Sequence, residues 1–408
     1  MLIKLIILIL MAAFFLFEVY KHLLSARQRK LSLPRNVRDI YDDQKYQTWS
    51  AYSTETNRVD LTERGVQFAL TFLLLLFNVH ARLSGILPQG MWANSILLVV
   101  ADMLIAVPIG VYFAWVQQMR VEEKYGFNRS TKKTFITDQI KQVIIGLVLM
   151  TSILCLYILF YEMLGLWGFI LLFAALAVII TLITTFSMQL SKLFNKYEPL
   201  PEGELRSRLE ALFEKHGYTL RHIYVMDASK RTSKVNAYCT GLGKNKEISL
   251  YDNLVANYTP DEITAVFAHE LAHFHFRDTM MLNLANMLTF LPMIALLLVM
   301  SVVPAFCQAF GFTGMHYGMV YILMGHLMQA VLIPVRAPVM AHMRACEYRA
   351  DAFAVQNGYG EALVSALKRL CKDNLADLNP HPLIVTLEHS HPTLSQRIAA
   401  VSALMAEK

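Results

Sequence analysis

Charged residues are scarce in this chain of 408 residues. Only 17% are Asp, Glu, Lys or Arg, whereas soluble globular proteins carry roughly a quarter. Apolar residues make up 55% of the chain, and the mean hydropathy is +0.41. The composition excludes an ordinary soluble protein. Because the apolar residues are gathered in long runs, it indicates an integral membrane protein.

Basic blocks, cysteine pairs and repeats are also missing. The net charge of +6 is spread among loops, so we expect no nucleic-acid partner. The five cysteines lie far apart and form no CxxC pair, which is typical of buried thiols and not of a disulfide framework. No internal repeat or low-complexity tract interrupts the chain.

Seven stretches are long and apolar enough to cross a bilayer, which takes roughly 20 helical residues. The first run is too long for a signal peptide and lacks a small-x-small cleavage site, so we interpret it as a span. The sequence therefore predicts a mainly α, polytopic membrane protein with the bilayer as a partner. The predicted spans are 2–24, 66–88, 91–115, 142–163, 165–188, 280–304 and 315–338.

Lysine and arginine are concentrated in the loops 25–65 and 116–141. The positive-inside rule places these loops in the cytoplasm and the N-terminus outside or in a lumen. With seven spans, the segments 189–279 and 339–408 also face the cytoplasm. The sequence leaves open whether the membrane is a bacterial inner membrane or that of the endoplasmic reticulum.

The segment between the fifth and sixth spans has the pattern of a small folded domain. Residues 201–217 predict an amphipathic helix that ends at Gly217, and 222–226 alternate like a strand. Residues 236–240 and 247–251 flank the turn-rich 241–246, which predicts a β-hairpin.

A helix with the pattern of a zinc site follows. Thr259 and Glu262 match a capping box with proline between them, so a helix begins here. His269 and His273 lie four residues apart and can direct two nitrogens at one cation, with Glu270 beside them to take a proton from water. Zinc suits such a donor set.

Glu347 is the best candidate for the third ligand. Asp351 lies on the same helical face, where it can accept the second N–H of a ligating histidine and fix its tautomer. Taken alone, this Glu-Arg-Asp run would be interpreted as an exposed charged face of a helix.

These motifs together resemble peptidase family M48, the membrane metalloproteases, and within it the Ste24 type, the CAAX prenyl proteases. The resemblance covers nearly the whole chain, and the ordered set of motifs is far more specific than HExxH alone. The matching motifs are HELAH at 269–273, ExxxD at 347–351, the segment 390–397, the loop 122–128 and Asn236-Ala-Tyr238.

The resemblance implies a site with a role for each of these residues. One Zn²⁺ per chain would be held by His269, His273 and Glu347, with Glu270 as the general base and Asp351 supporting a ligand. His391 and Arg397 would be catalytic and lie near the scissile bond. Asn236 and Ala237 would belong to an edge strand that pairs with the substrate backbone. One departure is Asp278, where eukaryotic members tend to carry histidine, and its role is left open.

The resemblance also implies an architecture: a barrel of seven transmembrane helices enclosing a chamber, capped by a cytoplasmic zincin-like protease domain with a small β-hairpin or sheet. We divide the chain into an N-terminal transmembrane region, 1–190, with five spans, and a metalloprotease domain, 191–408, with spans six and seven. The expected activity is zinc-dependent hydrolysis of CAAX-type prenylated or membrane-associated peptides or proteins.

Two alternatives stay open from the sequence. The first is an HtpX-like protease that degrades misfolded membrane proteins, which differs in substrate and not in chemistry. The second is a multispan transporter with an incidental histidine cluster, although no inverted repeat supports it.

Overall fold

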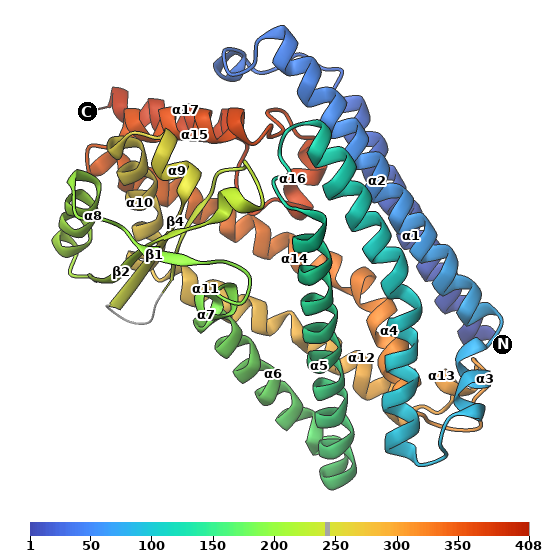
Figure 1. Ribbon diagram of the computed structural model, residues 1–408. Helices are drawn as coiled ribbons and strands as arrows, with labels where there is room; N and C mark the ends of the chain where they lie inside the picture. Colours follow the sequence, from blue (N-terminus) through green and yellow to red (C-terminus); the bar gives the residue numbers. More distant parts are fainter. Residues whose placement is uncertain (241–244, 408) are drawn as a thin grey trace.

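Long helices form one half of the molecule in the computed structural model, which describes residues 1–240 and 245–407 (Figure 1). Here α4, α5, α6, α12 and α14 meet α1 in one large apolar cluster. Apolar side chains at many positions also lie on the outer surface, as expected for helices that face lipid. The helices of this half are α1 (Leu2–Gln28), α2 (Asp43–Leu76), α3 (Val79–Ile86), α4 (Met91–Val116), α5 (Lys132–Leu164), α6 (Gly168–Thr185), α7 (Ser187–Ser191), α11 (Asp278–Leu288), α12 (Phe290–Val302), α13 (Ala305–Gln308) and α14 (Tyr317–Gln356).

In the described part of the chain, five helices are long and apolar enough to cross a membrane, or six if the bent pair α2–α3 is one span. That pair bends by 67°, with Asn78 between the two helices at a φ of 53°. The stretch 132–185 counts as one of these five helices, although it covers nearly all of two predicted spans, 142–163 and 165–188. Seven separate spans therefore stay a prediction, and so does the orientation.

The stretch 132–185 folds back on itself. Gly165 ends α5 with a φ of 56°, and α6 then runs in the opposite direction, so that the two helices form a V in Figure 1. A Cβ on Gly168 would lie 2.2 Å from the carbonyl oxygen of Phe160, so only glycine permits this close turn.

The other half contains a small mixed sheet and the remaining helices. The strand order is β1-β2-β4-β3, with β2 parallel to β4 and the other pairs antiparallel. The predicted hairpin is confirmed as β3 and β4, whereas its turn at 241–244 lies outside the described residues. The strand β3 lies at an edge of the sheet. The elements are β1 (Tyr197–Pro199), β2 (Thr219–Met226), β3 (Ala237–Thr240), β4 (Asn245–Tyr251), α8 (Glu204–Lys215), α9 (Asp252–Asn257), α10 (Pro260–His275), α15 (Gly360–Asp373), α16 (Pro382–Glu388) and α17 (Leu394–Ala406).

Helix α14 connects the two halves. Its first turns lie in the apolar cluster of the membrane half, and its last turns pack against α10 and α15 beside the sheet. Pro334 and Pro338 lie within it. Its 40 residues thus carry the chain directly from the membrane region to the predicted site.

Candidate functional site

The helix α10 begins where the sequence predicts. The Thr259 hydroxyl accepts a hydrogen bond from the Glu262 N–H, and the Glu262 carboxylate accepts one from the Thr259 N–H. The same carboxylate accepts hydrogen bonds from Ser365 and Arg369 on α15. The start of the helix is therefore fixed both locally and by tertiary contacts, which sets the direction in which His269 and His273 point.

His269, His273 and Glu347 converge on one point between α10 and α14. The distance from His269 Nε2 to Glu347 Oε2 is 3.3 Å, and that from His273 Nε2 to Glu347 Oε1 is 3.4 Å. Tetrahedral zinc with bonds of about 2.0–2.1 Å separates its ligand atoms by roughly 3.3 Å. In the described part of the chain, this is the one group of at least three His, Cys, Asp or Glu side chains close enough to share a metal ion.

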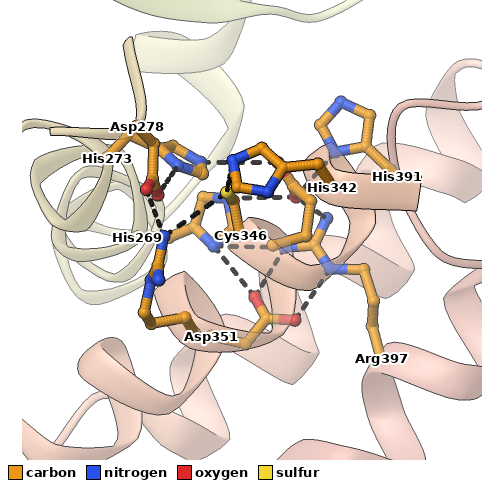
Figure 2. A network of polar contacts seen from close by, with 10 residues as sticks. His269, His273, Asp278, His342, Cys346, Asp351, His391 and Arg397 are labelled. Atoms are coloured by element: carbon orange, nitrogen blue, oxygen red, sulfur yellow. Dashed lines mark hydrogen bonds and ion pairs between the residues drawn. The ribbon is translucent and has the colours of Figure 1, made fainter. Parts of the chain in front are cut away.

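The outward nitrogens of both histidines also have carboxylate partners. Asp351 Oδ1 lies 2.9 Å from His269 Nδ1, and Asp278 Oδ2 lies 3.1 Å from His273 Nδ1 (Figure 2). A carboxylate at Nδ1 favours the tautomer whose Nε2 carries a lone pair. Both free lone pairs are thereby directed at Glu347, as a cation site requires.

The surrounding charge also favours a cation. Burial and the Arg397 guanidinium act to lower the pKa of His269, but Asp351 and Glu347 outweigh them and raise it to about 9. A donor set that retains a proton at neutral pH is one in which a metal ion can replace that proton. The residues thus fit zinc in chemistry as well as in spacing.

Arg397 and His391 both approach Glu347 Oε2 but differ in exposure. Arg397 is buried and binds Asp351 through two hydrogen bonds, of 2.9 Å from Nε and 2.6 Å from Nη2. His391 Nδ1 lies 2.6 Å from Glu347 Oε2, while its side chain is 59% exposed. Arg397 thus has Asp351 as its main partner, with Nη1 also 3.5 Å from Glu347 Oε2, and His391 is the more exposed of the two.

A cavity of about 140 Å³ is lined by six of the nine predicted site residues, while His273, Glu347 and Asp351 lie outside its lining. The start of the edge strand lines it together with Glu270 and His391, and apolar side chains complete the lining. The sequence-predicted residues therefore lie together, although they come from four separate segments. The cavity is lined by Asn236, Ala237, Leu254, Val266, His269, Glu270, Leu363, Leu367, Leu370, His391 and Arg397.

Asp278 is the residue to which sequence reasoning assigned no role. Arg277 before it has a φ of 61°, so the chain turns sharply after α10 and brings the Asp278 carboxylate back to His273. Arg349 also forms an ion pair with Asp278. The spacing of five residues from His273 was a usable signal, since one turn after a helix end can return a carboxylate to that helix.

Comparisons with known proteins agree with this geometry. Residues 199–405 match the family described as peptidase family M48, and residues 20–196 match "CAAX prenyl protease N-terminal, five membrane helices". The chain is 31% identical to a CAAX prenyl protease 1 homolog of Arabidopsis thaliana, over 96% of this chain and 95% of that one. It is also 31% identical to CAAX prenyl protease 1 of Saccharomyces cerevisiae, over 97% and 94% of the two chains.

A solved structure is similar along the whole chain. The crystal structure of S. mikatae Ste24p superposes with a TM-score of 0.92 at 27% identity, covering 98% of this chain and 99% of that one. These matches exclude the transporter interpretation. With its apolar helices and its buried His–Glu cluster, the chain is a multi-pass membrane metalloendopeptidase that belongs to peptidase family M48, of the Ste24 or CAAX prenyl protease type.

Proposed function

We propose that this protein is a zinc peptidase that hydrolyses prenylated CAAX-type or other membrane-associated peptides. The observation that carries the proposal is the convergence of His269, His273 and Glu347 next to a cavity that His269, Glu270 and the start of the edge strand β3 line. The three convergent side chains would hold the ion, and Asp351 and Asp278 would orient the two histidines. When bound, zinc would supply a Lewis acid that polarises the scissile carbonyl and activates water.

Glu270 acts as the general base in this proposal. It follows His269 directly on α10 and lines the cavity, so its carboxylate can take the proton of the attacking water. The same carboxylate can then deliver that proton to the amine that leaves. This order of events leaves Glu270 ionised at the end of each turnover.

His391 is the better placed of the two residues expected to stabilise the oxyanion. It faces the cavity, and its exposed side chain is within reach of a bound peptide. The Arg397 guanidinium forms two hydrogen bonds with Asp351. Arg397 would therefore contribute by fixing that carboxylate and by placing a positive charge behind His269.

The substrate is proposed to bind as an added strand along β3. This strand has a free edge, and Asn236 and Ala237 at its start line the cavity. The leucines on the opposite wall suit an apolar side chain of the peptide. The relatives named as CAAX prenyl proteases favour prenylated peptides, and misfolded membrane proteins are the second candidate class of substrate.

The membrane arrangement belongs to the same proposal. Seven spans would form a barrel around a chamber, and the site would face the cytoplasm, with the N-terminus outside. Because α14 carries both membrane residues and Glu347, the site would lie close to the membrane surface, where lipid-anchored peptides arrive.

The test measures bound zinc and hydrolysis in the same purified samples. We expect about one zinc per chain and cleavage of a farnesylated CAAX peptide faster than of its unprenylated form. Glu270→Gln should keep the zinc and lose about 10²–10⁴ in kcat. Full turnover by Glu270→Gln would overturn the mechanism. Faster cleavage of misfolded membrane proteins than of the prenylated peptide would instead indicate a protease of membrane-protein quality control.

A further inference from the structure

The loop motif 122–128 has no role in the proposed chemistry, yet it contacts the segment that leads into β3. The Ser233 N–H donates to the Phe127 carbonyl at 3.0 Å, and the Ser233 hydroxyl donates to the Gly126 carbonyl at 2.9 Å. One turn of π-helix, Gln117–Glu122, precedes the loop. The N-terminal half of the chain thus forms a short backbone ladder directly before the proposed substrate strand.

Lys234 is the centre of the side-chain contacts between these two segments. Its Nζ donates to Glu122 Oε1 and to the Tyr52 hydroxyl, each at 2.9 Å, and the Tyr52 hydroxyl donates to Glu122 Oε1 at 2.7 Å. The ammonium also lies 4.7 Å from the centre of the Phe127 ring and 5.4 Å from that of Tyr52. It therefore has partners from α2 and from the loop together.

This charge is held in place and not merely solvated. The side chains of Lys234 and Glu122 are 35% and 15% exposed. Burial acts to lower the pKa of Lys234, but the hydrogen bonds to Tyr52 and Glu122 outweigh it and raise that pKa. The ammonium therefore stays charged at neutral pH, and loss of Glu122 would leave a partly buried charge without its carboxylate.

The residues around Lys234 transmit its position to the strand. Val235 donates its N–H to Asn374 Oδ1 at 2.8 Å and accepts from Asn374 Nδ2 at 3.0 Å. Asn253 donates to the Lys234 carbonyl at 2.8 Å. Asn236 follows immediately, so nothing flexible separates these contacts from the start of the edge strand. A shift of the Lys234 backbone would therefore be passed to the start of β3.

We propose that Lys234, Glu122 and Tyr52 form a latch that holds the start of the substrate strand β3 in the position that binds the peptide backbone. The proposal rests on the proposed function, because it assigns to β3 the binding of the peptide backbone. Lys234 is then a positioning residue of the peptidase, and the loop motif 122–128 is its support from the membrane half. The latch acts on peptide binding, and the metal site does not depend on it.

The test separates peptide binding from turnover. Lys234→Met and Glu122→Gln should each raise KM for a peptide substrate about tenfold, with kcat within about twofold, since they remove binding common to substrate and transition state. The double variant should be no worse than either single variant, because both break one unit. Lys234→Arg should recover most of the loss.

The matched control is Glu55→Gln. Glu55 pairs with Lys124 of the same loop, but that pair is exposed and does not touch the β3 segment. It should leave KM unchanged. An equal rise of KM in Glu55→Gln, additive effects of the two latch variants, or an unchanged KM in both would overturn the proposal.

A second measurement does not depend on activity. Backbone amides of 237–240 should exchange with deuterium about tenfold faster in Glu122→Gln, while those of α8 keep their wild-type rate. Unchanged exchange in β3 rules the latch out, even if Lys234→Met fails to fold. Hydrolysis by Glu270→Gln would instead refute the proposed function, so the two failures are distinguishable.

Discussion

The two sides of the metal site are built differently. On the His269 side, Asp351 is fully buried and is bound in turn by the buried Arg397. On the His273 side, Asp278 is bound by Arg349, whose side chain is 45% exposed. Both sides give a histidine the same kind of partner, a carboxylate at Nδ1. They differ in the arginine that binds this carboxylate: water can replace the exposed Arg349 but not the buried Arg397.

The exposure of the two arginines determines whether each aspartate contributes to the stability of the fold as well as to metal affinity. A buried ion pair that loses one member leaves an uncompensated charge, which costs about 3–5 kcal/mol, whereas exposed pairs contribute about 0–1 kcal/mol. We therefore expect the Asp351 side to matter for both folding and metal binding. Asp278 is also buried, but its partner Arg349 is open to water, so the Asp278 side should matter more for metal binding than for folding.

Removal of Glu347 has the largest expected effect, because both histidines face it. Glu347→Ala should abolish stoichiometric zinc and all hydrolysis, since two ligands do not make a stable site. Zinc content of the purified protein measures this, with the exposed Glu361→Ala as control. If the variant still held one zinc per chain, Glu347 would not be the ligand that both histidine sides share.

Replacement of Asp351 should have the next largest effect. Asp351→Asn should weaken zinc about 10–100-fold and lower the free energy of unfolding by about 3–5 kcal/mol, because Arg397 loses its buried partner. Chelator competition and denaturation of the detergent-solubilised protein measure the two quantities. Asp351→Asn combined with Arg397→Met should regain stability and not zinc affinity. Additive loss of stability in the double variant would contradict this account.

Asp278→Asn tests the His273 side of the site, where the arginine partner is exposed. Zinc affinity should fall about tenfold, which is the lower end of the roughly 10–100-fold range for residues that hydrogen-bond a metal ligand. The free energy of unfolding should change by less than about 1 kcal/mol. Arg349→Gln should change neither quantity by more than about twofold or 0.5 kcal/mol. If Asp278→Asn destabilised the protein as much as Asp351→Asn, the distinction between a buried and an open side would be wrong.

No effect on zinc is expected at the start of α10, which lies away from both sides. The hydrogen bonds of Glu262 with Thr259, Ser365 and Arg369 outweigh burial and lower its pKa. A lowered pKa stabilises the fold above the unfolded value of about 4.3 and loses that effect as the pH falls. Glu262→Gln should thus cost about 1 kcal/mol at pH 7, and this cost should shrink as the pH falls through the lowered pKa of the folded state, without changing zinc affinity. A pH-independent difference in unfolding would show that the charge is not responsible.

The local features of the site were predictable from the sequence because local physics determines them. The capping box at Thr259, the spacing of His269 and His273, and the common face of Glu347 and Asp351 each depend on residues within one or two helical turns. The strand alternation at 222–226 and the long apolar runs are equally local.

Features that depend on distant residues were not predictable in the same way. Nothing local to Lys234 indicates that Glu122 lies beside it, 112 positions earlier in the chain. The ion pair of Arg397 with Asp351 depends on how α17 packs on α14, and no pattern near either residue indicates it. The bend after α2 depends on Asn78, one residue in a left-handed conformation within an otherwise continuous apolar run.

Helix α14 has a consequence for how the depth of the site can change. A helix rises about 1.5 Å and turns about 100° with each residue. One residue inserted between Pro338 and Glu347 would move the carboxylate only slightly away from the bilayer, but it would rotate it out of the gap between His269 and His273. The position of Glu347 along α14 and the direction of its carboxylate therefore cannot be altered independently. An insertion close to a whole turn would restore the aim of the carboxylate, but it would move it about 5.4 Å along the helix, away from the two histidines that α10 holds.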